Sequence, residues 1–571
     1  METGIPMKYT LLTLTAAGWP RRFSGIGIAT SRFRCRFLLP LLAVCLGVAS
    51  NVGIAGERQA VVVTITAEAP GYGADQVDDL VTTPIAIALN GMPGVRRIRS
   101  RATAGRAAVW VEFASGTDVY KARQATAERL QLAVRELPNA VVPTLAPLFV
   151  PDEIMLVALR FAGKASEEDT RRAEELRELA DLVVRRRLLA MPNVGQVVVT
   201  GGLVGQCQVI VSPEKMAQRG LTISELVSAM EQTLGKYTAR PDRQEILVVR
   251  DALTLDDLGE IVLAVRQGQV LRLRDVAQVR LSSVPPHRAP SRPKGEVKIP
   301  PQPAVLLGVL TQPESDAKRL SRELDRVLDE LSATLPAGVR LSRRFPPELA
   351  PLALQMAEDI QRDQPPEVVL RQETSADLGA VLVQELPPRT TIVILGPDRA
   401  HLRNAGRDLA DRLRKVPGVV DVQADSLEEA PQMRINVDRR SAARLGVPIG
   451  DALAAVEVAC EGRKVGHLQD SRTQRSVDVL VTCGGDMRND AESLQKLLLT
   501  TATGETITLG QLAKFEVVSA PRSLNREQMQ PAILISCEAQ ACDRAQSMAE
   551  IKRAIAAAEQ KLPVGYHVSC D

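Results

Sequence analysis

Short β-branched runs and amphipathic stretches alternate along the chain from residue 61 onward. Residues 61–67 read VVVTITA, a β-branched run with partial alternation, which predicts a strand. A helix is expected to begin at Ala74, with aspartates in its first turns, where the helix dipole favours negative charge. Strands at 97–101 and 107–113 and a second helix are expected to follow. This β-α-β-β-α-β order predicts an α+β fold built from ferredoxin-like split units, with helices on one face of the sheet.

Three blocks of sequence recur at a nearly constant offset. The matching pairs are Pro192 with Pro417, Gly220 with Gly446, and Leu335 with Leu562. Repetition at a fixed offset predicts two copies of one structural plan. In each copy the glycine, Gly220 or Gly446, follows an expected helix and is predicted to adopt a left-handed backbone there.

The N-terminal segment 1–56 differs from the rest of the chain in charge and in the pattern of apolar positions. It carries six basic residues against one acid and includes the apolar run FLLPLLAVCLGVAS at 37–50. This pattern is typical of a secretory signal peptide. The alternative is an uncleaved N-terminal anchor, for which the run is short. We therefore expect a periplasmic or cell-envelope protein, held at the inner membrane if the segment is retained.

Composition argues against several classes of function. The chain has 71 Lys and Arg against 68 Asp and Glu, and its excess of +3 lies in the leader, so no basic face for nucleic acid is expected. Beyond residue 56, no apolar run approaches the roughly 20 residues of a membrane span. Nucleophile-elbow, zinc-protease and phosphate-loop motifs are absent from the sequence, and its four histidines lie far apart. We expect neither an enzyme nor a bound cofactor.

Methionines are the remaining candidates for chemistry. Thioether sulfur is a soft ligand suited to Cu(I), although isolated methionines more often fill apolar cores. The candidate metal ligands are Met433, Met487 and Met529, and both interpretations stay open for them.

Several motifs resemble the periplasmic segments of resistance-nodulation-division (RND) efflux permeases. The motifs are VDDLVTTPI at 77–85, GMPGV at 91–95, DVYKAR at 118–123, ARLG at 443–446 and NRE at 525–527. The sequence at 118–123 resembles that of the heavy-metal branch, the CusA/CzcA-like pumps, more than that of the multidrug branch. The similarity extends over nearly all of 60–571, with the motif order preserved.

The resemblance implies a map of porter and docking subdomains. It implies a first porter subdomain at 60–149, a second split between 152–200 and 287–344 with a docking subdomain at 201–286 inserted, a remnant of a third porter subdomain or a linker at 347–385, and a fourth split between 388–428 and 519–571 with a second docking subdomain at 429–518 inserted.

Family members also have membrane spans that carry the proton relay, and the sequence shows no counterpart of them. The expected function is therefore that of a membrane-free periplasmic relative of the heavy-metal permeases, acting in substrate binding or adaptor contact. The implied partners are a periplasmic adaptor (membrane fusion) protein, a full-length permease and further copies of this chain in a homotrimer. The alternative is a non-transporting scaffold or oligomerisation module, or a decayed permease fragment.

Overall fold

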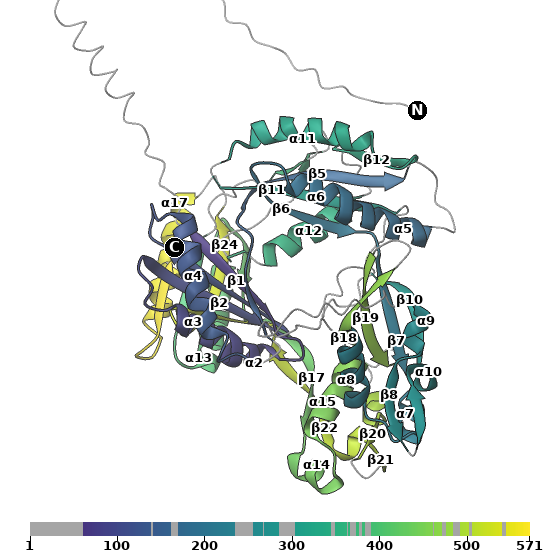
Figure 1. Ribbon diagram of the computed structural model, residues 1–571. Helices are drawn as coiled ribbons and strands as arrows, with labels where there is room; N and C mark the ends of the chain where they lie inside the picture. The colour runs from purple at the N-terminus through teal and green to yellow at the C-terminus, as the bar shows by residue number, and fades with distance from the viewer. Residues whose placement is uncertain are drawn as a thin grey trace, which may run out of the picture. The chain divides into compact units, whose positions relative to one another are not determined.

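The strands form six sheets in the part of the chain that the computed structural model describes (Figure 1). One sheet has nine strands, one has six, one has four, and three have two. The leader expected at 1–56 and Met487 lie outside the described residues, and none of the described helices is both long and apolar enough to cross a membrane. The described residues are 61–138, 141–161, 169–234, 255–266, 268–284, 303–313, 315–343, 349–362, 364–365, 373–375, 380–382, 390–460, 462–470, 475–483, 491–501, 505–539 and 544–570.

The first ferredoxin-like unit is confirmed. Its strands pair in the order β2-β3-β1-β4. Residues Val63, Ile65 and Ala67 of β1 are buried while their neighbours are less so, which is the alternation that predicted the strand. The elements are β1 (Val62–Glu68), β2 (Val95–Thr103), β3 (Arg106–Phe113), α4 (Val119–Ala133) and β4 (Pro143–Leu145).

A π-helical turn interrupts the helix that the sequence predicts from Ala74. The helix runs as α2 (Ala74–Val77), η1 (Asp78–Thr82) and α3 (Thr83–Leu89). The Thr83 N–H donates to the carbonyl of Asp78, five residues earlier, which widens the helix. Pro84 lacks an N–H and cannot continue regular α-helical bonding across this point. Asp78 and Thr82 are buried in the widened turn.

The C-terminal part of the chain completes the same nine-stranded sheet. Strand β2 pairs antiparallel with β23, with Arg99 opposite Glu527 and Arg101 opposite Asn525. Figure 1 shows the purple strands of the first unit beside the yellow strands of the chain end. We call the β2–β23 pairing the seam. The added elements are β15 (Thr390–Leu395), α13 (Arg399–Leu413), β16 (Val419–Ala424), β23 (Ser523–Glu527), β24 (Gln530–Ala539), α17 (Arg544–Glu559) and β25 (His567–Cys570).

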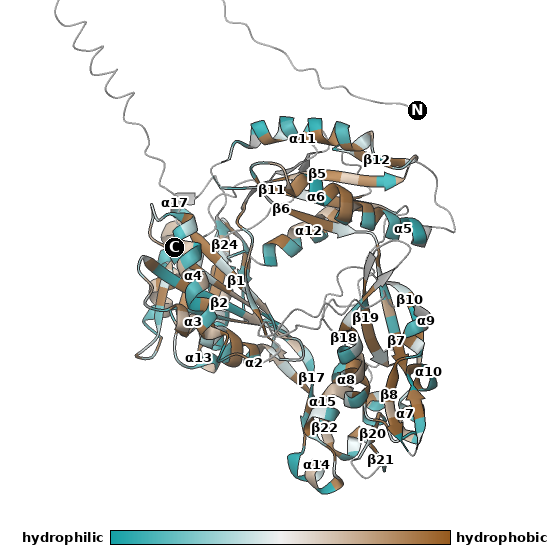
Figure 2. Ribbon diagram, in the orientation of Figure 1, coloured by the Kyte–Doolittle hydropathy of each residue, from teal (hydrophilic) through white to brown (hydrophobic). Residues whose placement is uncertain are grey.

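Helices cover both faces of the six-stranded sheet, whereas the sequence predicts helices on one face only. All eight residues of β11 are buried, as in a central strand with helices on both sides. Val305, Leu307 and Val309 pack against α5, η2, α6 and α11, and Leu306 and Leu310 pack against α12. Helix α12 and the hairpin β13–β14 come from the segment expected to be a remnant or linker, and they complete this sheet. In Figure 2 hydrophilic and hydrophobic residues alternate along α11, as in a helix with one face in the core. The elements are β5 (Val150–Phe161), α5 (Asp169–Glu178), η2 (Leu179–Val184), α6 (Arg185–Leu189), β6 (Val194–Gly201), β11 (Ala304–Thr311), α11 (Ala317–Ser332), β12 (Val339–Ser342), α12 (Ala350–Arg362), β13 (Glu373–Ser375) and β14 (Ala380–Leu382).

The two inserted regions share one four-stranded sheet, in the order β10-β7-β19-β18, where β7 and β19 run parallel. One apolar cluster joins residues of both inserts, including Cys207 and Cys483. The sheet and its helices are β7 (Val204–Val211), α7 (Pro213–Gln218), α8 (Ile223–Leu234), α9 (Leu255–Gly259), α10 (Leu273–Val276), β10 (Ala277–Val284), α14 (Arg439–Leu445), α15 (Ile449–Cys460), β18 (Arg463–Asp470), β19 (Arg475–Cys483), α16 (Ala491–Gln495) and η5 (Leu509–Gln511). The two-stranded sheets are β8 (Val262–Arg266) with β9 (Gln269–Arg272), β17 (Glu429–Val437) with β22 (Ala513–Pro521), and β20 (Leu498–Thr500) with β21 (Thr506–Thr508).

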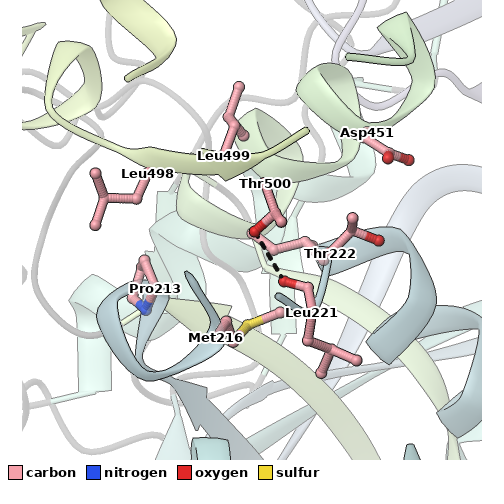
Figure 3. A pocket seen from close by; sticks show the side chains of 9 residues that line it. Pro213, Met216, Leu221, Thr222, Asp451, Leu498, Leu499 and Thr500 are labelled. Atoms are coloured by element: carbon pink, nitrogen blue, oxygen red, sulfur yellow. Dashed lines mark hydrogen bonds between the residues drawn. The ribbon is translucent and has the colours of Figure 1, made fainter. Parts of the chain in front are cut away.

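A direct side-chain contact also joins the inserts. Figure 3 shows Thr500 of the second insert donating from its hydroxyl to the carbonyl of Leu221 in the first, at 3.2 Å. Met216 and Leu499 line the same small cavity, of about 10 Å³, which holds at most one water molecule. Gly220 and Gly446 have φ of 63° and 66°, so the left-handed backbone predicted at both positions is confirmed.

Candidate functional site

Three aspartates project from the helix that carries the π-turn. Asp75 lies in α2, and Asp78 and Asp79 open η1. The side chain of Asp78 is 1% exposed, whereas those of Asp75 and Asp79 are about half exposed or more. A buried carboxylate is costly unless it is paired and hydrogen-bonded, so the surroundings of Asp78 decide what this cluster does.

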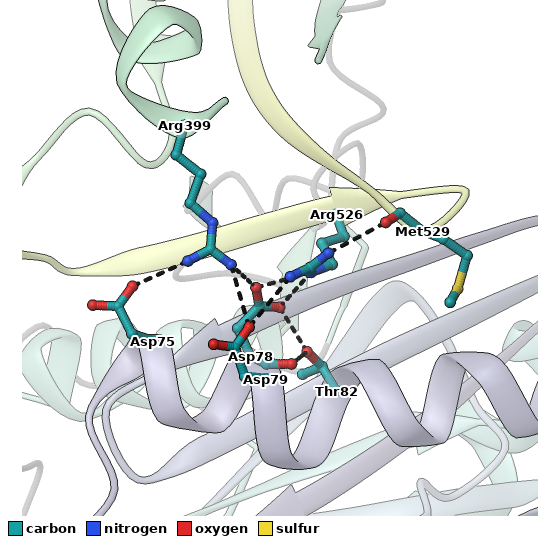
Figure 4. Close-up of polar contacts among 7 residues, drawn as sticks. All are labelled: Asp75, Asp78, Asp79, Thr82, Arg399, Arg526 and Met529. Atoms are coloured by element: carbon teal, nitrogen blue, oxygen red, sulfur yellow. Dashed lines mark hydrogen bonds and ion pairs between the residues drawn. The ribbon is translucent and has the colours of Figure 1, made fainter. Parts of the chain in front are cut away.

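Two arginines from the C-terminal part of the chain approach this cluster (Figure 4). The Nε of Arg526, on β23, lies 2.8 Å and 3.0 Å from the two carboxylate oxygens of Asp78. Arg399, in the first turn of α13, donates to Asp78 and to Asp75, the latter at 3.2 Å. Arg526 also reaches Asp79 at 3.4 Å. We call these five residues the aspartate–arginine cluster.

Within the cluster, Asp78 also accepts a hydrogen bond of 2.8 Å from the hydroxyl of Thr82, one turn along the helix. Both carboxylate oxygens are therefore satisfied, and the charge is balanced by guanidinium groups that are themselves 18% and 31% exposed. Removing one partner of a buried ion pair typically costs about 3–5 kcal/mol. The cluster thus joins the first unit to the C-terminal part of the chain. It resembles a structural network of ion pairs more than a catalytic pair.

Polar contacts continue along the seam. Arg97 bonds Glu112 on β3 at 3.1 Å and Glu527 on β23 at 3.3 Å. Arg101 donates to the side-chain oxygen of Asn525 at 3.2 Å and stacks its guanidinium over Trp110, 5.6 Å from the ring centroid. Charged pairs across neighbouring strands fix the strand register, so the pairing of β2 with β23 is specified by side chains as well as by backbone.

A cavity of about 270 Å³ adjoins the aspartate–arginine cluster. Charged and polar groups from α2, α13, β17, β22, β23 and the loop after β16 face it, together with apolar residues of β22 to β24. The lining residues are Asp75, Arg399, Leu402, Arg403, Ser426, Arg434, Val518, Ser519, Ala520, Pro521, Leu524, Asn525, Pro531, Ala532 and Ile533. We call this space the arginine cavity.

The sequence-predicted methionines do not come together in the described structure. Met433 lies on β17 opposite Val517 and packs against the apolar cluster of the two inserts. Met529 packs against the core of the first unit, and its carbonyl accepts a hydrogen bond from Arg526 at 3.3 Å. Figure 4 shows the sulfur of Met529 directed away from the aspartates. Among the described residues there is also no group of three His, Cys, Asp or Glu side chains that could hold a metal ion.

Sequence reasoning missed the pairing of Asp78 with Arg399 and Arg526. It interpreted Asp78 only as an acid that suits a helix dipole. The available signals were the motif residues VDD at 77–79 and NRE at 525–527, which bear opposite charges. Nothing local in either motif indicates that the two segments meet.

A model of the AcrB/AcrD/AcrF family matches residues 56–346 and 382–570. Cation efflux system protein CzcA of Alcaligenes sp. (strain CT14) is 30% identical over 292 residues, which is 49% of this chain and 26% of that protein. Cation efflux system protein CusA of Escherichia coli (strain K12) is 28% identical over 286 residues, again 49% of this chain and 26% of the relative. The chain thus spans about a quarter of the length of these curated relatives. Their names are those of transport proteins, not of enzymes.

A solved X-ray structure of a heavy metal efflux pump, in its crystal form II, has the same fold. The two superpose with a TM-score of 0.69 and 16% sequence identity, over 90% of this chain and 79% of that one. Crystal form I of the pump gives a TM-score of 0.67.

Proposed function

Because this chain belongs to the AcrB/AcrD/AcrF family and is permease-like in its similarity to heavy-metal efflux proteins, we propose that it acts as a membrane-free periplasmic part of such an efflux assembly. In this role it contacts the periplasmic adaptor or binds substrate cations, and it is not an autonomous pump. Adaptor proteins and trimeric assembly are general among pumps of this family. The observation that carries the proposal concerns the two inserts, 201–286 and 429–518. Both contribute strands to one sheet, and both contribute residues to one apolar core.

The subdomain map belongs to this proposal. It assigns 60–149 and the split pair 388–428 and 519–571 to porter subdomains, and 201–286 and 429–518 to docking subdomains. Support comes from the strands, because the porter assignments contribute strands to the nine-stranded sheet and both docking assignments contribute strands to the four-stranded sheet.

Adaptor contact has a candidate surface on the hairpin β8–β9. The side chains of Val262, Val265 and Val270 are 49%, 65% and 47% exposed on this short hairpin. Clustered exposed apolar residues mark interaction sites in soluble domains. This favours a protein partner over a decayed fragment.

Cation binding is the second role. Met433, Met487 and Met529 remain its proposed soft ligands. Met433 and Met529 each need further ligands, because they pack against different apolar clusters. Thioether ligands select Cu(I) over harder divalent ions, so this role predicts binding of Cu(I) ahead of Co(II).

Affinity capture with the purified adaptor and the full chain tests the first role. Val265→Lys places a charge on the exposed hairpin, and Val564→Lys places the same charge on a turn residue that is also open to solvent. Capture by the wild type and by Val564→Lys, together with loss of capture by Val265→Lys, is the expected result. If the wild type does not capture the adaptor, the proposed role in adaptor contact is wrong.

Calorimetry with Cu(I), Zn(II) and Co(II) tests the second role. A heat of binding with Cu(I) that disappears in Met433→Leu or in Met529→Leu supports it, because leucine keeps the side-chain volume and removes the sulfur. Absence of heat with all three ions rules it out. A stable trimer without adaptor capture or metal binding would favour the alternative function, a non-transporting oligomerisation module.

A further inference from the structure

The arginine cavity has the wrong charge for a cation. Its lining contains three guanidinium groups, those of Arg399, Arg403 and Arg434, against the single carboxylate of Asp75. That carboxylate is already bound by Arg399 at 3.2 Å. Arg399 is balanced by Asp75 and Asp78, and Arg403 by Glu429, so the charge left to repel a cation at short range is that of Arg434. The cavity therefore does not suit the metal cargo of the proposed function.

An acidic residue that contacts the cavity lining is also engaged. Glu429 bonds Arg403 at 2.9 Å and accepts a hydrogen bond of 2.7 Å from Ser519. The Ser519 hydroxyl and then Arg403 and Arg407 hold the pKa of Glu429 below its ordinary range, so it remains a carboxylate. Glu516 lies opposite Arg434 across β17 and β22. Among the described residues, Arg434 has no ion-pair or hydrogen-bond partner, Glu516 included.

Ser426 adds a second, independent feature. It is 7% exposed, lines the cavity, and has a φ of 67°, a backbone angle that residues other than glycine rarely adopt. Backbone strain of this kind concentrates at ligand sites. The Ser426 Oγ accepts a hydrogen bond of 2.9 Å from Asn525, which orients the hydroxyl and leaves its own proton able to donate.

We propose that the arginine cavity binds a small organic anion with two or more carboxylate or phosphate groups. Arg434 and the second amino group of Arg403 supply forked donors that match such groups, and Ser426 supplies a neutral donor. The volume of about 270 Å³ lies near the lower end of small-molecule sites, which span roughly 300–1,000 Å³, so the ligand is of the size of citrate. This inference is independent of adaptor contact and of metal binding.

Calorimetry on the full chain tests the inference, with citrate and inorganic phosphate as separate probes and sodium chloride at matched ionic strength as the blank. Arg434→Gln removes a cavity donor that has no described partner, so folding is expected to be unaffected, and an unchanged thermal unfolding midpoint verifies this. Arg444→Gln, on the exposed side of α14, is the matched control. We expect Arg434→Gln to weaken citrate binding by about tenfold or more, as for loss of a charged hydrogen bond, and Arg444→Gln to leave it unchanged.

The two probes separate the two chemistries of ligand. Tighter binding of citrate assigns the cavity to polycarboxylates, and tighter binding of phosphate assigns it to phosphorylated molecules. Arg434→Lys keeps the charge but loses the fork, and is expected to bind with intermediate affinity. The proposal is overturned if neither probe binds the wild type at about 10 mM, far above a typical metabolite-site Kd, or if Arg434→Gln binds as tightly as the wild type.

Discussion

The Nε of Arg526 lies 2.8 Å and 3.0 Å from the two carboxylate oxygens of Asp78, although the residues are 448 positions apart in the chain. Removing this guanidinium leaves a buried carboxylate with fewer partners. Arg526→Met, which keeps much of the side-chain volume, is therefore expected to lower the free energy of unfolding by about 3 kcal/mol. Arg522→Met removes an exposed ion pair with Glu428 and is expected to cost under about 1 kcal/mol. Urea unfolding measures the free energy of unfolding of both variants. Equal effects would contradict a stabilising role for the buried ion pair between Asp78 and Arg526.

Overpacking the six-stranded sheet tests its two-sided core. A Cβ on Gly308 of β11 would lie 2.4 Å from the sulfur of Met356 on α12 and 3.0 Å from Ile154. Gly308→Ala is expected to destabilise the protein by about 1–3 kcal/mol, the usual cost of forcing an extra methyl group into a packed core. Gly205→Ala is the matched control, because its Cβ would meet no atom within 4 Å. A neutral Gly308→Ala in thermal unfolding would mean that α12 does not cover this face.

Substitution by alanine at two glycines of one insert is expected to change stability in opposite directions, because the backbone conformations of the two glycines differ. Gly446 ends α14 with a φ of 66°, so Gly446→Ala is expected to lower stability by about 1 kcal/mol. Gly450 lies in the first turn of α15, and a Cβ there meets no atom within 4 Å. Gly450→Ala is expected to raise stability by up to about 1 kcal/mol, because alanine favours the helix. Chemical unfolding of the two variants side by side measures the difference, and a shift of the same sign in both would be inconsistent with these conformations.

Thiol reactivity is expected to differ sharply among the cysteines. Burial raises the pKa of Cys207 to about 11, and burial together with the neighbouring Cys460 raises that of Cys483 to about 12. Both stay protonated at pH 8 and are expected to resist alkylation in the folded protein, whereas the exposed Cys570 reacts. Mass spectrometry after iodoacetamide treatment locates the label.

The same pKa values set a dependence of stability on pH. A thiol whose pKa is higher in the folded state than its ordinary 9.0 disfavours the folded state once the unfolded chain ionises. Stability is therefore expected to be independent of these thiols below about pH 8 and to fall as the pH rises from 9.0 toward 12. The Cys483→Ala variant should lose part of this alkaline dependence, and an unchanged pH profile would remove the thiol as its cause.

The sequence predicted the local plan of the first unit because alternation in β1 and the turn residues after it act within a few positions. It also predicted the left-handed backbone of Gly220 and Gly446, since only a helix end requires that conformation there. The π-turn at Asp78 was not predicted, although Pro84, which cannot donate a backbone hydrogen bond, follows it directly in α3.

The seam and the aspartate–arginine cluster could not be predicted, because their contacts join segments that lie far apart along the chain. Pairing of this kind depends on the whole folded sheet, and neither Asp78 nor Arg399 carries a local signature of it. The two-sided six-stranded sheet escaped prediction for a related reason. The sequence of α12 shows an apolar side, but it does not indicate which strands that side covers.

The seam also constrains how the protein can be made. Strand β2 is synthesised early and its partner β23 late, since Arg101 and Asn525, which face each other across the seam, are 424 positions apart. At about 5–20 residues per second, this is a delay of roughly 20–80 s. During that time the first unit has an open sheet edge and Asp78 lacks both arginines, a state prone to edge-to-edge aggregation. Until β23 has been made, the edge of β2 is therefore open to pairing with strands of other chains.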